Sequence, residues 1–358
     1  MNILLIRLRL IGDVVFTTPA VAALRRHYPD ASLTYLVEPP AEPVVRHNPH
    51  LDAVIVAERP PGVRRLLYDA ALALRLRRAR FDLVIDFHGG PRSAWLTRAT
   101  GAHRRIGYGL PGRHFAYTDR VAWTRALVPP RHSVENQWDL LTPLGIAPPQ
   151  AGQTPVEMAL DAGAAATVTR RLREAQVPDD APIVLIHVSA GNPFRRWPAE
   201  HFAEVAAALA REDRARRIII TSGPSERGAA DAIAHDAQAR AGEAAGGVVR
   251  CGEFDLSELR VLAAKAALYV GGDSGPLHIA ATSDVPIVAL FGPTLPQRSM
   301  PWRRAETRAV AVDGGPLGCR PCHQRHCVPG DFRCLTQVKP ERVLTAARQL
   351  LNEESSRP

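Results

Sequence analysis

Short apolar runs alternate along the chain with segments whose apolar residues recur every three or four positions. The first run, residues 2–7, precedes Gly12-Asp13 and a helical pattern to about His27, within which Pro19 indicates a kink or a helix start. Further strands are expected at 32–37, 53–57 and 83–87, and helices at 64–77 and from about 91. Strands that alternate with helices predict a parallel, doubly wound α/β sheet.

A second series of the same kind follows a proline-rich stretch at 147–155. Its strands are expected at 183–188, 217–221, 248–250, 268–270 and 287–291, and its helices at 199–210, 225–239, 255–265, 275–282 and 340–352. We therefore predict two Rossmann-like halves that face a cleft, because ligands of such sheets bind beyond the carboxyl ends of the strands. The expected divisions are 1–160, a linker region at 161–180, 181–339, and a C-terminal helix and tail at 340–358.

Composition narrows the class of protein. The chain has 358 residues, of which 46% are apolar, so it can bury a large core, and it is unlike disordered, collagen-like or disulfide-scaffold sequences. No apolar run reaches the 18–20 residues of a membrane span. The start is apolar but broken by Arg7 and Arg9 and lacks the form of a signal peptide. A cytoplasmic protein is expected.

The positive charge is concentrated in one segment. The whole chain has a net charge of +9, whereas residues 59–131 alone hold 15 arginines against four aspartates, a net charge of +11. Such a field attracts an anionic partner, whether nucleic acid, a phosphorylated glycolipid or an acidic membrane surface. A solvated basic face is the simpler alternative. Aromatic residues are not interleaved as in single-strand nucleic-acid sites.

The stretch 269–280 carries the most informative motif. A strand ends at Gly271-Gly272, and Asp273-Ser274-Gly275 opens the next helix, whose free backbone N–H groups suit a phosphate without a metal. Ser274 adds a hydroxyl donor, Gly275 permits close approach, and His278 lies one turn later on the same face. Asp273 suits ribose hydroxyls, backbone N–H groups or a cation. The alternative interpretation is an N-cap aspartate and a packed core histidine.

A second loop, residues 188–198, follows the first strand of the same half. It contains Ser189 and the pair Arg195-Arg196, whose planar guanidinium groups suit pyrophosphate oxygens. We predict Arg195 as the phosphate contact. Two surface arginines on a loop are the alternative.

The first half offers candidates at two strand ends. Asp13 is a candidate general base that takes the proton of an acceptor hydroxyl, or else a plain helix N-cap. At the second strand end, His88, Arg92 and Ser93 are candidates for acceptor contact, with a buried His88 as the alternative. Candidates for acidic acceptor groups are Arg64, Arg65, Arg104, Arg105 and Arg113.

Four of the five cysteines cluster near the C-terminus, at 319, 322, 327 and 334, close to two histidines. A Cys-x-x-Cys pair with two further sulfurs resembles a structural zinc ligand set. Reduced thiols in an ordered loop and a redox pair remain alternatives, and no metal residue is assigned.

These residues resemble glycosyltransferase family 9, the ADP-heptose:lipopolysaccharide heptosyltransferases. The resemblance extends over almost the entire chain, and its specific signal is Asp-Ser-Gly-Pro-Leu-His at 273–278 with Phe-Gly-Pro-Thr at 291–294. Further matches are Ile-Gly-Asp at 11–13, the segment 86–93, Arg-Ile-Gly-Tyr at 105–108 and Arg-Arg-Trp-Pro at 195–198. Members commonly have lysine where this chain has Arg195.

The resemblance implies a GT-B fold and an inverting, metal-independent transfer of heptose from ADP-L-glycero-D-manno-heptose to the lipopolysaccharide inner core, with no cofactor. It assigns Asp13 as the base. The nucleotide sugar would bind at Ser189, Arg195, Asp273, Ser274, Gly275, His278, Gly292 and Thr294, and the acceptor at Arg64, Arg65, His88 and Arg92. The acceptor would be a phosphorylated lipid A-Kdo type molecule at the cytoplasmic face of the inner membrane, with the enzyme bound peripherally. Another nucleotide sugar, or a nucleotide-sugar epimerase, is the alternative; a nucleic-acid partner is not expected.

Overall fold

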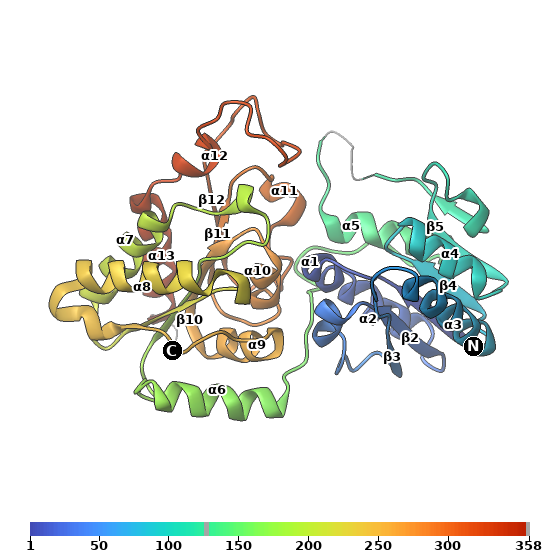
Figure 1. Ribbon diagram of the computed structural model, residues 1–358, viewed down its shortest axis with the longest axis horizontal. Coiled ribbons are helices and arrows are strands. Elements are labelled where there is room, and N and C mark those ends of the chain that lie inside the picture. Colours follow the sequence, from blue (N-terminus) through green and yellow to red (C-terminus); the bar gives the residue numbers. More distant parts are fainter. Residues whose placement is uncertain (125–128, 356–358) are drawn as a thin grey trace. The chain divides into compact units, whose positions relative to one another are not determined.

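The computed structural model describes residues 1–124 and 129–355. The chain separates into two compact units, with the boundary between Ala159 and Leu160, and each unit is built on a six-stranded sheet (Figure 1). All strand pairs are parallel. The predicted pair of doubly wound α/β halves is confirmed.

The sheet of the first unit has the order β3-β2-β1-β4-β5-β6. Its strands are β1 (Asn2–Ile6), β2 (Ser32–Val37), β3 (Ala53–Val56), β4 (Leu83–Asp86), β5 (Arg104–Tyr108) and β6 (Asp119–Val121). Its helices are α1 (Ile11–Val15), α2 (Thr18–His27), α3 (Arg64–Arg78), α4 (Pro91–Ala99) and α5 (Ser133–Trp138), with 3-10 turns η1 (Pro39–Val44), η2 (His114–Ala116) and η3 (Asp139–Leu144). The central strand β1 is buried along Ile3–Ile6, as a strand covered by helices on both faces must be.

The helix predicted to end near His27 is two helices. α1 ends at Val15, and Pro19 lies in the first turn of α2, where its missing N–H costs no hydrogen bond. α3 and α4 supply Leu72, Leu76 and Leu96 to a core cluster on one face of the sheet.

The second unit repeats the arrangement with the order β12-β11-β10-β7-β8-β9. Its strands are β7 (Ile183–His187), β8 (Arg217–Thr221), β9 (Val248–Val249), β10 (Ala266–Gly272), β11 (Ile287–Phe291) and β12 (Ala309–Asp313). Its helices are α6 (Ala162–Glu174), α7 (Ala199–Glu212), α8 (Arg227–Ala241), α9 (Leu256–Lys265), α10 (Gly275–Ala280), α11 (Pro296–Ser299), α12 (Arg333–Thr336) and α13 (Pro340–Ser355), with 3-10 turns η4 (Pro193–Arg195), η5 (Pro224–Glu226) and η6 (Gly242–Gly247).

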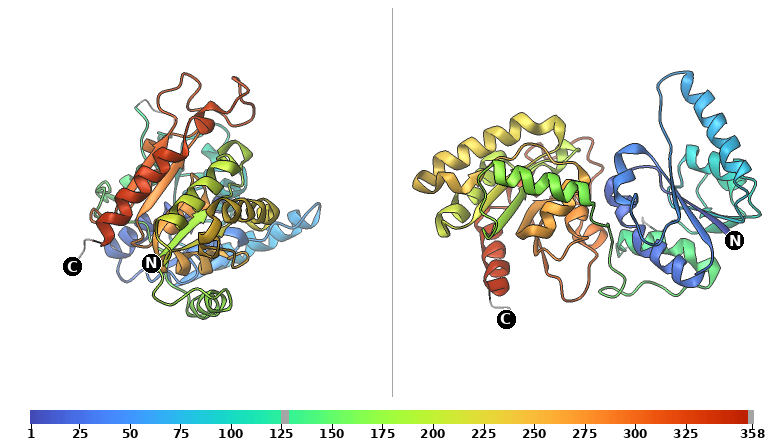
Figure 2. Two further views of the ribbon diagram at one scale, coloured as in Figure 1. Left: turned by 90° about the vertical axis from the view of Figure 1, so that its left-hand side faces the viewer. Right: turned by 90° about the horizontal axis from the view of Figure 1, so that it is seen from below.

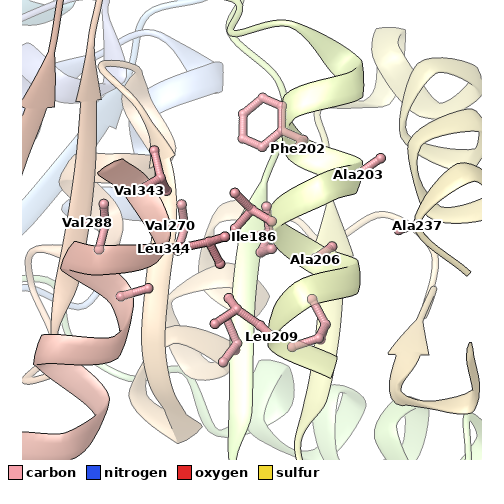
Figure 3. Close-up of a cluster of buried hydrophobic side chains, with 14 of the residues drawn as sticks. Ile186, Phe202, Ala203, Ala206, Leu209, Ala237, Val270, Val288, Val343 and Leu344 are labelled. Atoms are coloured by element: carbon pink, nitrogen blue, oxygen red, sulfur yellow. The ribbon is translucent and has the colours of Figure 1, made fainter. Parts of the chain in front are cut away.

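One face of this second sheet carries the main core of the unit. Phe202 and Leu209 of α7 and Leu344 of α13 belong to one cluster with Ile186 and Val270 of the central strands (Figure 3). All five side chains are buried. α9 and α10 contact β10 but contribute none of the described residues of this cluster, so they cover the opposite face of the sheet.

The segment 161–180, expected as a linker region, contains a helix that belongs to the second unit. α6 is capped by Asp161, whose carboxylate accepts from the N–H of Ala164, and it packs on α9 through Val168 and Leu172. The C-terminal helix expected at 340–352 is α13, which lies against β10, β11 and β12. Among the residues that the structure describes, no helix is long and apolar enough to cross a membrane.

Candidate active site

Each sheet has one point at which its strand order reverses, and the candidate residues lie in the loops there. In the first unit the order reverses between β1 and β4, which are followed by Asp13 and His88. In the second it reverses between β7 and β10, which are followed by Arg195 and Asp273. Crevices outside the strand ends at such a point are the usual ligand sites of doubly wound sheets.

Asp13 does not cap a helix. The N-cap of α1 is Leu10, whose φ of 69° places its backbone in a region that non-glycine residues seldom adopt, and no side chain caps this helix. The buried carboxylate of Asp13 instead accepts from the guanidinium of Arg7, and the side-chain amide of Gln137 donates to the Asp13 carbonyl at 3.2 Å. The N-cap alternative is therefore wrong, and the carboxylate is held by its ion pair with Arg7.

Arg7 is a further candidate site residue, one that the sequence analysis does not single out. It follows β1, is buried, and also donates to the Phe87 carbonyl at 2.7 Å, so one guanidinium joins the loops after β1 and β4. A small cavity adjoins this pair, lined by Arg7, Asp13, Phe87, Tyr108, Trp123, Ser133, Asn136 and Gln137. The available signal was an arginine at the carboxyl end of an otherwise apolar strand.

The loop after β4 is organised by a buried carboxylate. Asp86 accepts from Ser93 Oγ at 2.8 Å, from Tyr117 Oη at 2.7 Å and from the backbone N–H groups of His88 and Gly89. Burial raises the pKa of Asp86, and these four hydrogen bonds oppose that rise. Ser93 thus positions the loop. His88 is partly buried, and burial with the nearby charges of Arg7 and Arg9 lowers its pKa to about 4, so it is neutral at pH 7.

Arg92 is a correction to the acceptor residues expected from the sequence. Its guanidinium donates to Asp69 at 2.6 Å, to Glu38 at 2.8 Å and to the Glu58 carbonyl at 2.7 Å. These bonds occupy a side chain that is almost wholly buried, so Arg92 ties α3 and η1 to α4 and is not available to an acceptor.

The other arginine candidates differ in their hydrogen-bond and ion-pair partners. Arg104 pairs with Asp119 at 3.2 Å, and Arg105 donates to the carbonyls of Ala102 and Ala116, so both order the region between β5 and β6. Arg113 donates to the neighbouring Pro111 carbonyl at 2.7 Å. Arg64 is exposed, and Arg65 lies 3.7 Å from Asp69; both are at the start of α3.

In the second unit the structure brings Arg195, Asp273 and His278 together. Arg195 Nη1 donates to the Asp273 carbonyl at 3.0 Å and to its carboxylate at 3.2 Å. His278 Nε2 lies 3.4 Å from the other carboxylate oxygen. Burial by itself would raise the pKa of Asp273, but the bond and charge of His278, the charge of Arg195 and the nearby Thr294 hydroxyl hold it below its ordinary value. Asp273 is therefore an ionised, buried carboxylate.

Ser274 and Gly275 continue this loop. Ser274 is the N-cap of α10, yet its hydroxyl does not cap the helix, and among the described residues its buried Oγ has no hydrogen-bond partner. A buried hydroxyl without a partner is costly unless a ligand meets it. Gly272, just before, lies so near the Arg195 backbone that a Cβ there would be 3.3 Å from the Arg195 carbonyl oxygen. The two loops after β7 and β10 are therefore in close contact.

Ser189 has protein partners. Its Oγ accepts from the Gly223 N–H at 2.8 Å and lies 3.0 Å from His187 Nε2, while His187 Nδ1 lies 3.0 Å from Thr221 Oγ1. Burial lowers the pKa of His187 to about 4, so the imidazole is neutral. The chain of bonds fixes the loop after β7, which carries Ser189, against the loop after β8.

Gly292 and Thr294 follow β11. A Cβ at Gly292 would lie 2.6 Å from the Leu335 side chain, so close packing against α12 requires glycine. The Thr294 hydroxyl lies near the Asp273 carboxylate, and the Thr294 carbonyl accepts from Arg320 at 2.7 Å. Thr294 thus belongs to the Asp273 cluster, whereas Gly292 supports the packing behind it.

The cysteine-rich loop lies against the arginine loop. Gln324 Oε1 accepts from Arg195 Nε at 2.6 Å and from Asn192 Nδ2 at 3.1 Å, and Phe332 contacts Phe194. All five cysteines lie within the described residues and none forms a disulfide. Burial raises the pKa of Cys334 to about 11, so this thiol is protonated. Residues 1–124 and 129–355 hold no group of three or more His, Cys, Asp or Glu arranged for a metal ion.

Comparisons with known proteins agree with this geometry. The family model described as glycosyltransferase family 9 (heptosyltransferase) matches residues 70–332. Lipopolysaccharide heptosyltransferase 3 of Escherichia coli (strain K12) is 28% identical over 346 residues, which cover 96% of each chain. The glycosyltransferase family 9 structure from Veillonella parvula DSM 2008 superposes with a TM-score of 0.83 at 22% identity, over 98% of this chain and 97% of that one.

A second solved structure shows the same fold. It is the E. coli ADP-heptose lps heptosyltransferase II, with a TM-score of 0.76 at 21% identity, over 99% of this chain and 100% of that chain. The predicted GT-B fold is thereby confirmed, and since the family model matches well over half of the sequence, the chain belongs to glycosyltransferase family 9, the heptosyltransferases.

Proposed function

We propose that the protein transfers heptose from ADP-L-glycero-D-manno-heptose to the lipopolysaccharide inner core with inversion at the anomeric carbon. Relatives named lipopolysaccharide heptosyltransferase support the acceptor class. A structural neighbour described as E. coli heptosyltransferase WaaC with ADP-2-deoxy-2-fluoro heptose supports the donor class. The observation that carries the proposal is the Asp13 carboxylate, buried beside the strand-order reversal and held by Arg7 instead of capping α1.

Asp13 acts as the general base. The acceptor hydroxyl oxygen bonds to C1 of the heptose while the bond from C1 to the diphosphate oxygen breaks, and ADP leaves with that electron pair. The hydroxyl proton passes to the Asp13 carboxylate. One displacement from the face opposite ADP inverts the anomeric centre. A positioned base of this kind contributes about 10²–10⁴ in rate, and Arg7 and Gln137 supply the positioning.

The donor binds to the second unit. Arg195 is held by Asp273 and Gln324 through Nη1 and Nε, and among the described residues its Nη2 makes no hydrogen bond. This edge faces the diphosphate in our proposal, and the charge of Arg195 offsets the charge that develops on ADP without a required metal. The Ser274 hydroxyl and the backbone of Gly275 bind the same anion. Asp273, held between His278 and Arg195, accepts from ribose hydroxyls.

The acceptor binds to the first unit. His88 is neutral and offers a hydrogen bond to a sugar hydroxyl, while Arg64 and Arg65 at the start of α3 meet the phosphates of a lipid A-Kdo type molecule. The protein works as a peripheral enzyme at the cytoplasmic face of the inner membrane.

The test is transfer in vitro. The purified protein is incubated with ADP-heptose and a core acceptor that lacks heptose, and NMR assigns the anomeric configuration of the product. We expect an inverted linkage, formed at an unchanged rate in EDTA. Turnover of ADP-heptose without acceptor would instead indicate an epimerase, and a retained configuration would exclude Asp13 as a base for direct displacement.

A further inference from the structure

α3 is apolar on two opposite sides, and only one of them faces the core. Leu72 and Leu76 point into the core of the first unit. On the other side Val63, Leu66 and Leu67 are 75%, 72% and 71% exposed, and Leu74 is 48% exposed. Apolar stripes of a surface helix normally face a partner, so the outer stripe of α3 requires an explanation other than folding.

The exposed positions form one continuous stripe. Residues 63, 66, 67, 70 and 74 recur at spacings of three and four, which places them on one side of an α-helix with about 3.6 residues per turn. Residues 72, 73 and 76 occupy the opposite side and are buried. Figure 2 shows α3, in light blue, at the outer edge of the first unit, where this stripe meets solvent.

Exposed arginines border the stripe. Arg64 begins the helix, and Arg75, Arg77 and Arg78 occupy its last turns. The single acidic residue of α3, Asp69, is taken up by ion pairs with Arg92 and Arg65, so the helix presents almost unopposed positive charge around its apolar stripe. α4 packs against α3 and exposes Trp95, an aromatic residue type that is common at membrane interfaces.

We propose that the outer stripe of α3 (Val63, Leu66, Leu67 and Leu74) inserts into the surface of an anionic lipid bilayer while the flanking arginines bind lipid phosphates. An apolar stripe with basic borders has the two attractions that hold an amphipathic helix in a membrane interface. A second copy of the chain fits less well, because a two-fold contact through this face would bring the same arginines together. The inference rests on the proposed membrane location and names the element responsible.

The experiment measures partition of the full chain onto vesicles by flotation. Vesicles contain phosphatidylcholine alone or phosphatidylcholine with phosphatidylglycerol. We expect wild type to bind the anionic vesicles, with affinity that falls as salt rises. The variant Leu66→Ser/Leu67→Ser/Leu74→Ser should bind at least about tenfold more weakly. Arg75→Gln/Arg77→Gln/Arg78→Gln should bind more weakly and with a smaller salt dependence.

Two controls separate this inference from folding and from the reaction. Val328→Ser, which changes an 83% exposed apolar residue of the second unit, should bind vesicles like wild type. The triple serine variant should melt like wild type and keep its kcat/KM on a water-soluble core oligosaccharide. If wild type binds the vesicles but does not transfer heptose to the acceptor, the proposed function is refuted and this inference stands.

Three results would overturn the inference. One is a wild type that fails to bind anionic vesicles. Another is a triple serine variant that binds them as tightly as wild type. The third is a wild-type dimer in sedimentation velocity that the serine changes dissociate, since it would assign the stripe to a second copy.

Discussion

Replacement of Arg7 by glutamine tests how the Asp13 carboxylate is held. Arg7 and Asp13 are both buried, and their ion pair joins the residue after β1 to α1. Arg7→Gln removes the charge that faces Asp13 and the bond to the Phe87 carbonyl. The carboxylate then stays buried with only the small cavity beside it for solvation.

The expected cost follows from that burial. Removal of one partner of a buried ion pair costs about 3–5 kcal/mol, because the other charge is left without compensation. Asp13 borders a cavity, so we take the lower end, about 3 kcal/mol. For a unit of this size that loss lowers Tm by about 6–12 °C. The transfer rate should fall as well, because the base loses its orientation.

A double-mutant cycle, with the free energy of unfolding measured in urea, isolates the coupling energy between Arg7 and Asp13. Asp13→Asn removes the charge that Arg7→Gln would leave unpaired, so the double variant should be more stable than the sum of the two single losses predicts, by about 2 kcal/mol. Arg92→Gln is the matched control: it also breaks buried ion pairs in the first unit but none with Asp13, and its loss should add to that of Asp13→Asn within about 0.5 kcal/mol. If Arg7→Gln and Asp13→Asn also add within that margin, the ion pair does not hold the carboxylate.

Three further predictions concern the second unit. Arg195→Ala should raise KM for ADP-heptose by about 10–100-fold, because it removes a charged hydrogen bond to the donor, and should leave the acceptor KM near wild type. An unchanged donor KM in steady-state kinetics would contradict the assignment. Because burial lowers the pKa of His187 to about 4, the unfolded state alone takes up this proton between pH 6.5 and 4, so stability falls as pH falls through that window. His187→Gln should reduce that loss by about 3 kcal/mol in denaturant titrations at several pH values, and an identical pH slope in the variant would exclude this origin. Gly292→Ala should cost about 1–3 kcal/mol by crowding Leu335, and that cost should be smaller in a Leu335→Ala background, where the crowded side chain is gone. A neutral Gly292→Ala would show that the loop moves without cost.

Much of the fold is readable from the sequence because the central strands β1 and β7 are apolar except for one terminal residue each. Buried strands such as β1 and β7 stand out from the amphipathic helices that follow them, so their positions were predicted to within about two residues. Three strands were not predicted: β5, β6 and β12. β5 begins Arg104-Arg105 and β6 has only three residues, so neither has the apolar run of a central strand. β12 is a partly exposed strand at the edge of its sheet.

The candidate site, too, could be predicted from the sequence only in part. The loop that holds Asp273, Ser274 and His278 was located because a glycine-rich strand end and a short helix lie together in the sequence. The sequence is compatible with Asp13 as a base or as an N-cap, since both use an aspartate at a helix start, and the contact with Arg7 excludes only the N-cap. That contact depends on side-chain geometry that no spacing encodes.

The structure also changes the interpretation of the basic segment 59–131. Several of its arginines are paired within the protein: the buried Arg92 with Asp69, Arg104 with Asp119, and Arg131 with Asp139 at 2.8 Å. The arginines of α3 remain at the surface beside exposed leucines. Net charge located the segment, but burial identifies the helix that presents the charge.

The most direct test of the account is the single-turnover transfer rate of Asp13→Asn, measured beside its affinity for ADP-heptose by calorimetry. We predict a rate loss of at least about 10²-fold, with a donor Kd within about twofold of wild type, because the carboxylate serves as the base and the donor binds elsewhere. Asp139→Asn, a partly buried aspartate of the same unit that pairs with Arg131, should leave both quantities unchanged. A rate for Asp13→Asn close to that of wild type would contradict the assignment of Asp13 as the base and, with it, the proposed mechanism.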